Sequence, residues 1–211
     1  GRPGRRPRLA RRAALVGLLL AVWRQWRQAL LPKLQGMFAF ALWDPARREL
    51  VLARDRFGKK PLVYRQSGAR LAFASDLAAA EHLAGAGAVD PAAIRWLFTL
   101  RYIPEPMTAL QGFAKLPAGH CAVLSPDGFK IERWYDLAAA ERPRFESEEQ
   151  AAAALRARVE AAVADRLVAD VPVGAFLSGG IDSAIVAASM RKAASRVRTY
   201  TVGFEGVPDY Y

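Results

Sequence analysis

The stretch Val171-Pro172-Val173-Gly174-Ala175-Phe176-Leu177 runs directly into Ser178-Gly179-Gly180-Ile181-Asp182-Ser183. The first seven residues are an apolar run that favours a β-strand, and residues 184–192 favour a helix. A strand that turns through two glycines into a helix N-terminus presents free backbone N–H groups and the positive end of a helix dipole. This junction predicts an α/β domain with a parallel sheet, and it predicts an anion site where the helix begins.

The residues of the turn are suited to a nucleotide phosphate. Gly179 and Gly180 carry no side chain that would block a phosphate, and both can adopt positive φ. Ser178 and Ser183 add hydroxyl donors. Asp182 would repel a bare anion, so we expect Mg²⁺ to bridge it to phosphate oxygens. Helix capping by Asp182 and Ser183 alone is the alternative that the residue types leave open.

Upstream of this junction the pattern predicts an α+β domain of antiparallel strands and helices. We expect a helix over 18–34, hairpins 38–43/49–54 and 62–65/71–74, helices 76–83 and 90–100, and strands 113–116, 118–125 and 129–134. The charged segment 141–150, which contains Pro143, predicts a linker between domains 1–140 and 151–211. The second domain should hold a helix over 148–168, a strand 172–177, a helix 182–193 and a strand 198–204.

Composition narrows the class of protein. The 211 residues have a net charge of +11, but the first 30 contain eight arginines and no acid, so the remaining 181 carry only +3. A basic tail without a basic folded face argues against a nucleic-acid partner. The apolar run 13–23 is too short to span a bilayer, so we expect no membrane partner. One cysteine excludes an internal disulfide and fits the cytoplasm.

Five further segments occur in a characteristic order. They are Leu34–Asp44, Arg54–Leu62, Phe73–Leu77, Leu116–His120 and Asp170–Gly174. Together they resemble the glutamine-hydrolysing asparagine synthetase family, and Ser178–Ser183 resembles the PP-loop of ATP pyrophosphatases. The resemblance implies the remnant of a layered glutaminase domain of the N-terminal-nucleophile type, followed by the opening βα units of a PP-loop synthetase domain.

The resemblance also implies a reaction and its site. Members convert aspartate, ATP and glutamine to asparagine, AMP, pyrophosphate and glutamate through an acyl-adenylate. By this resemblance Leu177 and Val202 line the adenine pocket, although the residues alone are equally consistent with core positions. The positions that match the pyrophosphate loop, with Mg²⁺ on Asp182, are Ser178, Gly179, Gly180, Asp182 and Ser183.

The match fails at the start of the chain. No cysteine nucleophile stands there, and the position of the family's substrate-binding aspartate is Leu15. We therefore expect no glutaminase activity, a chain truncated at both ends with a misread beginning, and ATP binding that is weak or absent. A relative without glutaminase, such as a β-lactam synthetase, and a non-catalytic fragment remain alternatives. The open sheet edge after Val202 favours self-association, so a homodimer is expected.

Several other polar residues invite a catalytic interpretation. Arg54, Asp55, Arg56 and Lys60 form a charged cluster, but their place at a strand end and turn favours a structural role in holding the hairpin. Cys121 lies in an apolar run, which predicts a buried small side chain rather than a nucleophile. His82 and His120 have no partner at metal-ligand spacing.

Overall fold

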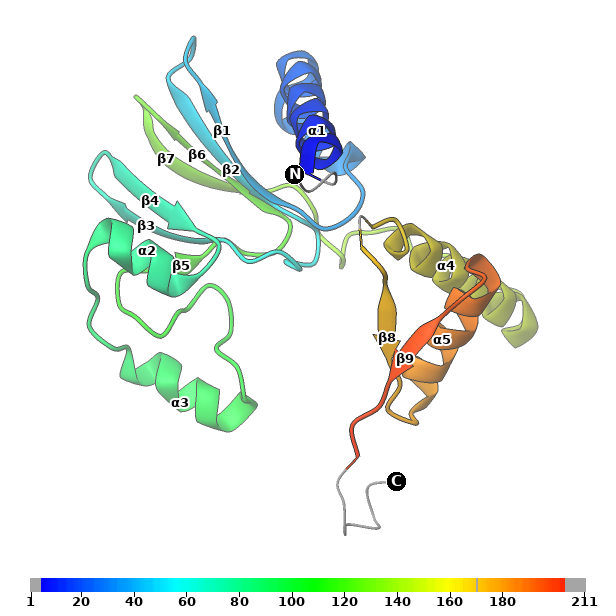
Figure 1. The fold of residues 1–211 in the computed structure, drawn as a ribbon. Coiled ribbons are helices and arrows are strands. Elements are labelled where there is room, and N and C mark those ends of the chain that lie inside the picture. Colours follow the sequence, from blue (N-terminus) through cyan, green and yellow to red (C-terminus); the bar gives the residue numbers. More distant parts are fainter. Residues whose placement is uncertain (1–4, 170, 204–211) are drawn as a thin grey trace. The chain divides into compact units, whose positions relative to one another are not determined.

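The computed structural model describes residues 5–169 and 171–203. The chain divides into two compact units, one of Arg11–Ala140 and another of Gly1–Ala10 together with Glu141–Tyr211. Figure 1 shows the elements of both.

The first unit is built on two antiparallel sheets. The larger has the order β1-β2-β6-β7, with strands β1 (Ala39–Asp44), β2 (Glu49–Arg54), β6 (His120–Ser125) and β7 (Gly128–Arg133). The smaller has the order β4-β3-β5, with strands β3 (Val63–Ser67), β4 (Arg70–Ala74) and β5 (Ala114–Lys115). The predicted antiparallel α+β architecture is confirmed for this unit.

The alternation of side chains along β2 explains the layers. Val51 and Ala53 are buried in a cluster with Trp23 of helix α1 (Arg5–Trp26). Leu52 points to the other face, where it packs with Leu116 and other residues of the smaller sheet's side. A strand whose two faces are both covered is apolar at successive positions rather than at alternate ones. Helix α1 therefore covers one face of the larger sheet, and the smaller sheet covers the other (Figure 1).

The first helical segment differs from the predicted helix over 18–34. Helix α1 begins earlier and ends at Trp26, and a 3₁₀ helix, η1, follows over Arg27–Lys33. Arg27 adopts a left-handed backbone with φ 51°, which an α-helix of L-residues cannot continue through. Its guanidinium group pairs with Asp44 and Glu49 at the end of the first hairpin. These ion pairs are distant in sequence, so helical periodicity does not reveal the break.

Two short helices are held by aspartate caps, as predicted. Helix α2 (Leu77–Ala84) begins after Asp76, whose side chain accepts a hydrogen bond from the Ala79 N–H. Helix α3 (Pro91–Leu100) begins after Asp90, which accepts from the N–H groups of Ala92 and Ala93. An aspartate at this position satisfies amides that have no acceptor within the helix.

The second unit contains a parallel strand pair beside two helices. Its elements are α4 (Glu148–Arg166), β8 (Gly174–Phe176), α5 (Ile181–Ala193) and β9 (Arg198–Tyr200). Strands β8 and β9 pair in parallel, with Gly174 opposite Arg198. Helices α4 and α5 pack together and carry a Glu160–Lys192 ion pair.

The strands of this unit are shorter than predicted. Strand β8 spans three residues rather than 172–177, in part because Pro172 has no N–H to give to a ladder. Strand β9 ends at Tyr200, so Val202 lies beyond the strand rather than at its end. Residue 204, the last of the predicted strand, lies outside the described residues. Helix α4 ends two residues before the predicted end at 168.

Candidate functional site

The predicted phosphate loop lies between β8 and α5. Residues 177–180 leave the strand, and Gly180 is the N-cap residue of α5 with extended backbone. Gly179 has φ 78°, a left-handed conformation that glycine adopts without a steric penalty. The amides in the first turn of α5 have no intrahelical acceptor, so they face the loop as donors for an anion. The strand–turn–helix predicted from the sequence is present.

Hydroxyl groups fix the shape of this loop. The Ser183 hydroxyl donates to the Gly180 carbonyl at 2.9 Å and accepts from the Ser178 N–H at 3.3 Å. The two hydroxyl oxygens of Ser178 and Ser183 lie 3.2 Å apart. Since the Ser183 hydrogen is already donated to Gly180, Ser178 is the donor in that contact. The structure thus brings Ser178, Gly179, Gly180 and Ser183 together in one exposed turn.

The two predicted adenine residues differ in exposure. Leu177 is half-buried, whereas 71% of Val202 is exposed, so Val202 is not a core residue of this chain. The Thr201 hydroxyl donates to the Leu177 carbonyl at 2.8 Å, and this bond holds the segments of Leu177 and Val202 beside each other. Sequence reasoning missed Thr201. A threonine just after the second strand of a parallel pair is the signal that could have drawn attention to it.

Asp182 is the carboxylate that lies nearest in sequence to the glycines of this turn. Asp182 lies in the first turn of α5. Within residues 5–169 and 171–203, no three His, Cys, Asp or Glu side chains gather as a metal cage. Mg²⁺ commonly binds through one or two carboxylates together with substrate phosphates, and Asp182 would supply one such carboxylate.

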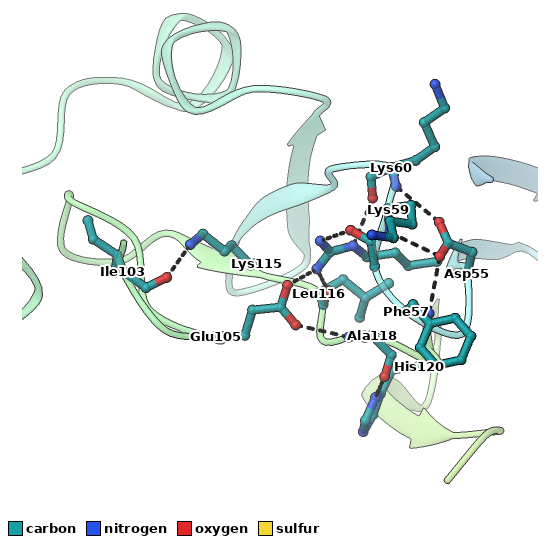
Figure 2. A network of polar contacts seen from close by, with 12 residues as sticks. Asp55, Phe57, Lys59, Lys60, Ile103, Glu105, Lys115, Leu116, Ala118 and His120 are labelled. Carbon is teal, nitrogen blue, oxygen red and sulfur yellow. Dashed lines mark hydrogen bonds and ion pairs between the residues drawn. The ribbon is translucent and has the colours of Figure 1, made fainter. Parts of the chain in front are cut away.

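Arg54 and Asp55, the two buried members of the charged cluster, belong to a structural network of hydrogen bonds (Figure 2), whereas Arg56 is half-buried and Lys60 is exposed. Asp55 is 2% exposed, and its carboxylate accepts four backbone hydrogen bonds. Their donors are the N–H groups of Phe38, Phe57, Lys59 and Lys60, at 3.0 to 3.2 Å. Burial raises the pKa of Asp55, but these hydrogen bonds outweigh it and leave the pKa below its usual value. The carboxylate is committed to holding the turn after β2.

Arg54 satisfies its charge in the same way. It is 5% exposed and donates to the carbonyls of Gly58, Lys60 and Leu116 and to the Glu105 carboxylate. Glu105 also accepts from the Ala118 N–H at 3.1 Å, as Figure 2 shows. These bonds join the turn after β2 to the segment before β6. The structural role predicted for the Arg54–Asp55 cluster is confirmed.

Lys115 and Arg56 complete the network. The Lys115 ammonium donates to the Ile103 carbonyl at 2.6 Å, and burial lowers its pKa, assisted by the charge of Arg54 and opposed by Glu105. Arg56 donates to the carbonyls of Pro32 and Leu34. These cations are bonded within the unit.

Cys121 is unsuited to nucleophilic chemistry. It is 1% exposed in β6, and burial, together with the nearby charge of Glu132, raises the pKa of its thiol to about 11. The reactive form of a cysteine is the thiolate, which this environment suppresses at neutral pH. His120 contacts the Ala118 carbonyl through Nδ1 at 2.8 Å. The prediction that Cys121 is a buried small side chain is confirmed.

Each half of the chain matches a known protein family. Residues 15–135 match the family model described as a glutamine amidotransferase domain, and residues 154–211 match the one described as asparagine synthase. The first match covers more than half of the chain, so the molecule is of the glutamine amidotransferase class.

Sequence similarity to individual proteins defines the family of this chain more narrowly. The chain is 32% identical, over 89% of its length, to the Bacillus subtilis protein named asparagine synthetase [glutamine-hydrolyzing] 1. It is 39% identical, over the same share, to a Mycobacterium bovis protein assigned by name to the same synthetases. The chain belongs to the glutamine-hydrolysing asparagine synthetase family. It spans about 30% of the length of these relatives.

A solved amidotransferase also aligns with the chain. It is the glutamine phosphoribosylpyrophosphate amidotransferase of B. subtilis, complexed with ADP and GMP, at a TM-score of 0.33 and 17% identity. The alignment covers 81% of this chain and 33% of that one. Separately, none of the helices in the described part of the chain combines the length and apolarity needed to cross a membrane.

Proposed function

We propose that residues 151–211 form the beginning of a synthetase domain that binds ATP through its pyrophosphate, with Mg²⁺ on Asp182. Residues 1–140 would be a glutamine amidotransferase domain, and 141–150 the linker between them. The separation of the chain into units near Glu141 supports this division. The asparagine synthase match, which starts at residue 154, supports it from sequence.

In the longer protein the proposed reaction is amide synthesis driven by ATP. Aspartate attacks the α-phosphorus of ATP, pyrophosphate leaves, and ammonia from glutamine then displaces AMP from the acyl-adenylate. In this scheme Ser178, Gly179, Gly180 and Ser183 hold the leaving pyrophosphate, and Leu177 and Val202 border the adenine. Cytoplasmic location and a homodimer are part of the proposal.

One observation carries the proposal. The segment 177–183 places a left-handed glycine, two serine hydroxyls and a helix N-terminus after a strand in a parallel pair. Backbone N–H groups and hydroxyls at such a junction are donors suited to phosphate oxygens. The turn lies within the segment that matches the asparagine synthase family.

The amidotransferase half would not hydrolyse glutamine in this chain. Its sole cysteine is Cys121, which is buried and has a raised pKa. We expect purified protein to release no ammonia from glutamine, and release above a heat-inactivated control would contradict that expectation.

Titration with magnesium pyrophosphate and with MgATP tests the nucleotide site. In ¹H–¹⁵N spectra of the 211-residue chain, we expect amides of residues 177–183 to shift with a Kd on the order of 1 mM. Asp182→Asn should weaken binding of both ligands about tenfold, because the metal loses its carboxylate. Asp165→Asn on α4 makes the same change away from the loop and should bind like the wild type.

The outcomes separate the proposal from general anion binding. Equal affinity for sulfate, or equal weakening by both substitutions, would indicate only charge attraction to a basic chain. No shift in residues 177–183 with either ligand would show that the proposal is wrong for this chain.

A further inference from the structure

The peptide unit that joins Leu177 to Ser178 is held at both of its edges by side-chain hydroxyls. Its carbonyl accepts from the Thr201 hydroxyl at 2.8 Å. Its N–H donates to the Ser183 hydroxyl oxygen at 3.3 Å. The two hydroxyls come from different elements, one from the segment after β9 and one from the first turn of α5. This peptide unit is the first one that lies wholly beyond the strand, which ends at Phe176.

Thr201 replaces the bond that a regular parallel ladder would supply. The Leu177 N–H still donates to the Tyr200 carbonyl at 2.8 Å, one step beyond the last paired residues, Phe176 and Tyr200. In a continuing parallel ladder, the Leu177 carbonyl would next accept from the N–H of residue 202. Here the Thr201 hydroxyl donates a hydrogen bond to that carbonyl instead. The backbone after Tyr200 can then diverge from the loop without leaving the carbonyl unsatisfied.

Holding the Leu177–Ser178 peptide plane in place restricts the conformation of the loop that follows it. A peptide bond is planar, so fixing its carbonyl also fixes the direction of its N–H. The next two residues, Gly179 and Gly180, have the widest conformational freedom of any residue type. Without a fixed entry plane, the glycine amides would sample many directions, and an anion would have to order them on binding.

We propose that Thr201 is a positioning residue for the phosphate loop: its hydroxyl fixes the Leu177–Ser178 peptide plane from one side, while Ser183 fixes it from the other. This inference rests on the proposed function for its effect on affinity. The effect on loop order follows from the hydrogen bonds alone. It also assigns Ser183 a bracing role within the loop in addition to any contact with phosphate.

Thr201→Val and Thr201→Ser provide the test, because valine keeps the shape and serine keeps the hydroxyl. Thr199→Val makes the same change two residues earlier on β9 and serves as the control. The readouts on the full chain are the hydrogen-exchange rate of the Ser178 amide and the Kd for magnesium pyrophosphate. We expect Thr201→Val to raise the exchange rate and weaken binding by about fivefold to tenfold. Thr201→Ser should restore both, and Thr199→Val should change neither.

Each result bears on a different claim. An unchanged Ser178 exchange rate in Thr201→Val overturns the positioning role, whatever the affinity. Faster exchange in Thr201→Val, rescued by serine, in a chain whose wild type does not bind pyrophosphate would support the positioning role and reject the proposed function. If Thr201→Val does not fold, Ser183→Ala removes the other side of the clamp, and an unchanged Ser178 exchange rate there overturns the proposal.

Discussion

Substitution of Asp55 by asparagine tests the central claim about the first unit, that its charged cluster is structural. Each carboxylate oxygen accepts two backbone N–H bonds, Oδ1 from Phe57 and Lys59 and Oδ2 from Phe38 and Lys60. An asparagine offers one carbonyl oxygen and one NH₂ group. Two buried N–H groups would therefore face a donor instead of an acceptor.

The magnitude follows from those two bonds. A hydrogen bond to a charged group contributes roughly 1.5 kcal/mol or more to stability, so the loss of two costs about 3 kcal/mol. That is a large share of the roughly 5–15 kcal/mol by which a domain is stable. Asp76→Asn is the matched control, because it caps α2 with one hydrogen bond and asparagine caps as well as aspartate. Its cost should stay below about 0.5 kcal/mol.

The pH dependence gives a second, independent measure. The pKa of Asp55 is lowered in the folded chain, so its contribution to stability is present above the unfolded pKa of about 3.9. That contribution is lost as the pH falls through the lower, folded-state pKa. The stability gap between wild type and Asp55→Asn should therefore narrow as the pH is lowered from 7 to 3.

Urea denaturation monitored by tryptophan fluorescence measures both effects. All five tryptophans lie between residues 11 and 140, so the signal reports on this unit alone. A loss below about 1 kcal/mol at pH 7, or a gap that widens in acid, would refute the argument from the four hydrogen bonds.

Two further predictions concern packing in the same unit. Gly119 has φ 67°, and a Cβ there would lie 2.8 Å from the Tyr135 carbonyl oxygen, so Gly119→Ala should destabilise by more than about 2 kcal/mol in urea denaturation. Gly68→Ala, at φ 56° with open space, should cost only about 1 kcal/mol, and equal costs would contradict the clash. Cys121 should resist iodoacetamide at pH 8 in the folded chain and react readily in urea, because burial raises its pKa to about 11. Rapid labelling of the folded chain, followed by mass spectrometry, would contradict this.

The elements predicted well from sequence are those whose signals are local. The caps Asp76 and Asp90 each stand directly before their helix, and the first hairpin has its turn residues between two apolar runs. Such features act within a few residues, so the sequence around them contains the whole cause.

The errors arise where distant contacts decide the backbone. Helix α1 ends at Trp26 because Arg27 turns to pair with Asp44 and Glu49, some 20 residues away. Strand β9 ends at Tyr200, and beyond it the Thr201 hydroxyl, rather than a backbone N–H, donates a hydrogen bond to the Leu177 carbonyl. Neither partner is visible in the periodicity of the segment that it alters.

The same contrast separates the two polar clusters of the molecule. Arg54 and Asp55 combine strong charge with nearly complete burial, and each is held by four hydrogen bonds within the unit. The Asp55 carboxylate has no free acceptor position for a ligand, and Arg54 uses four of its five N–H donors within the unit. The turn at 178–183 has the opposite properties. It is largely exposed, and helix α5, which begins there, has first-turn amides with no acceptor within the helix. Backbone N–H donors without an acceptor in the helix, rather than charge density, are therefore the feature on which we base the proposal that this turn binds phosphate.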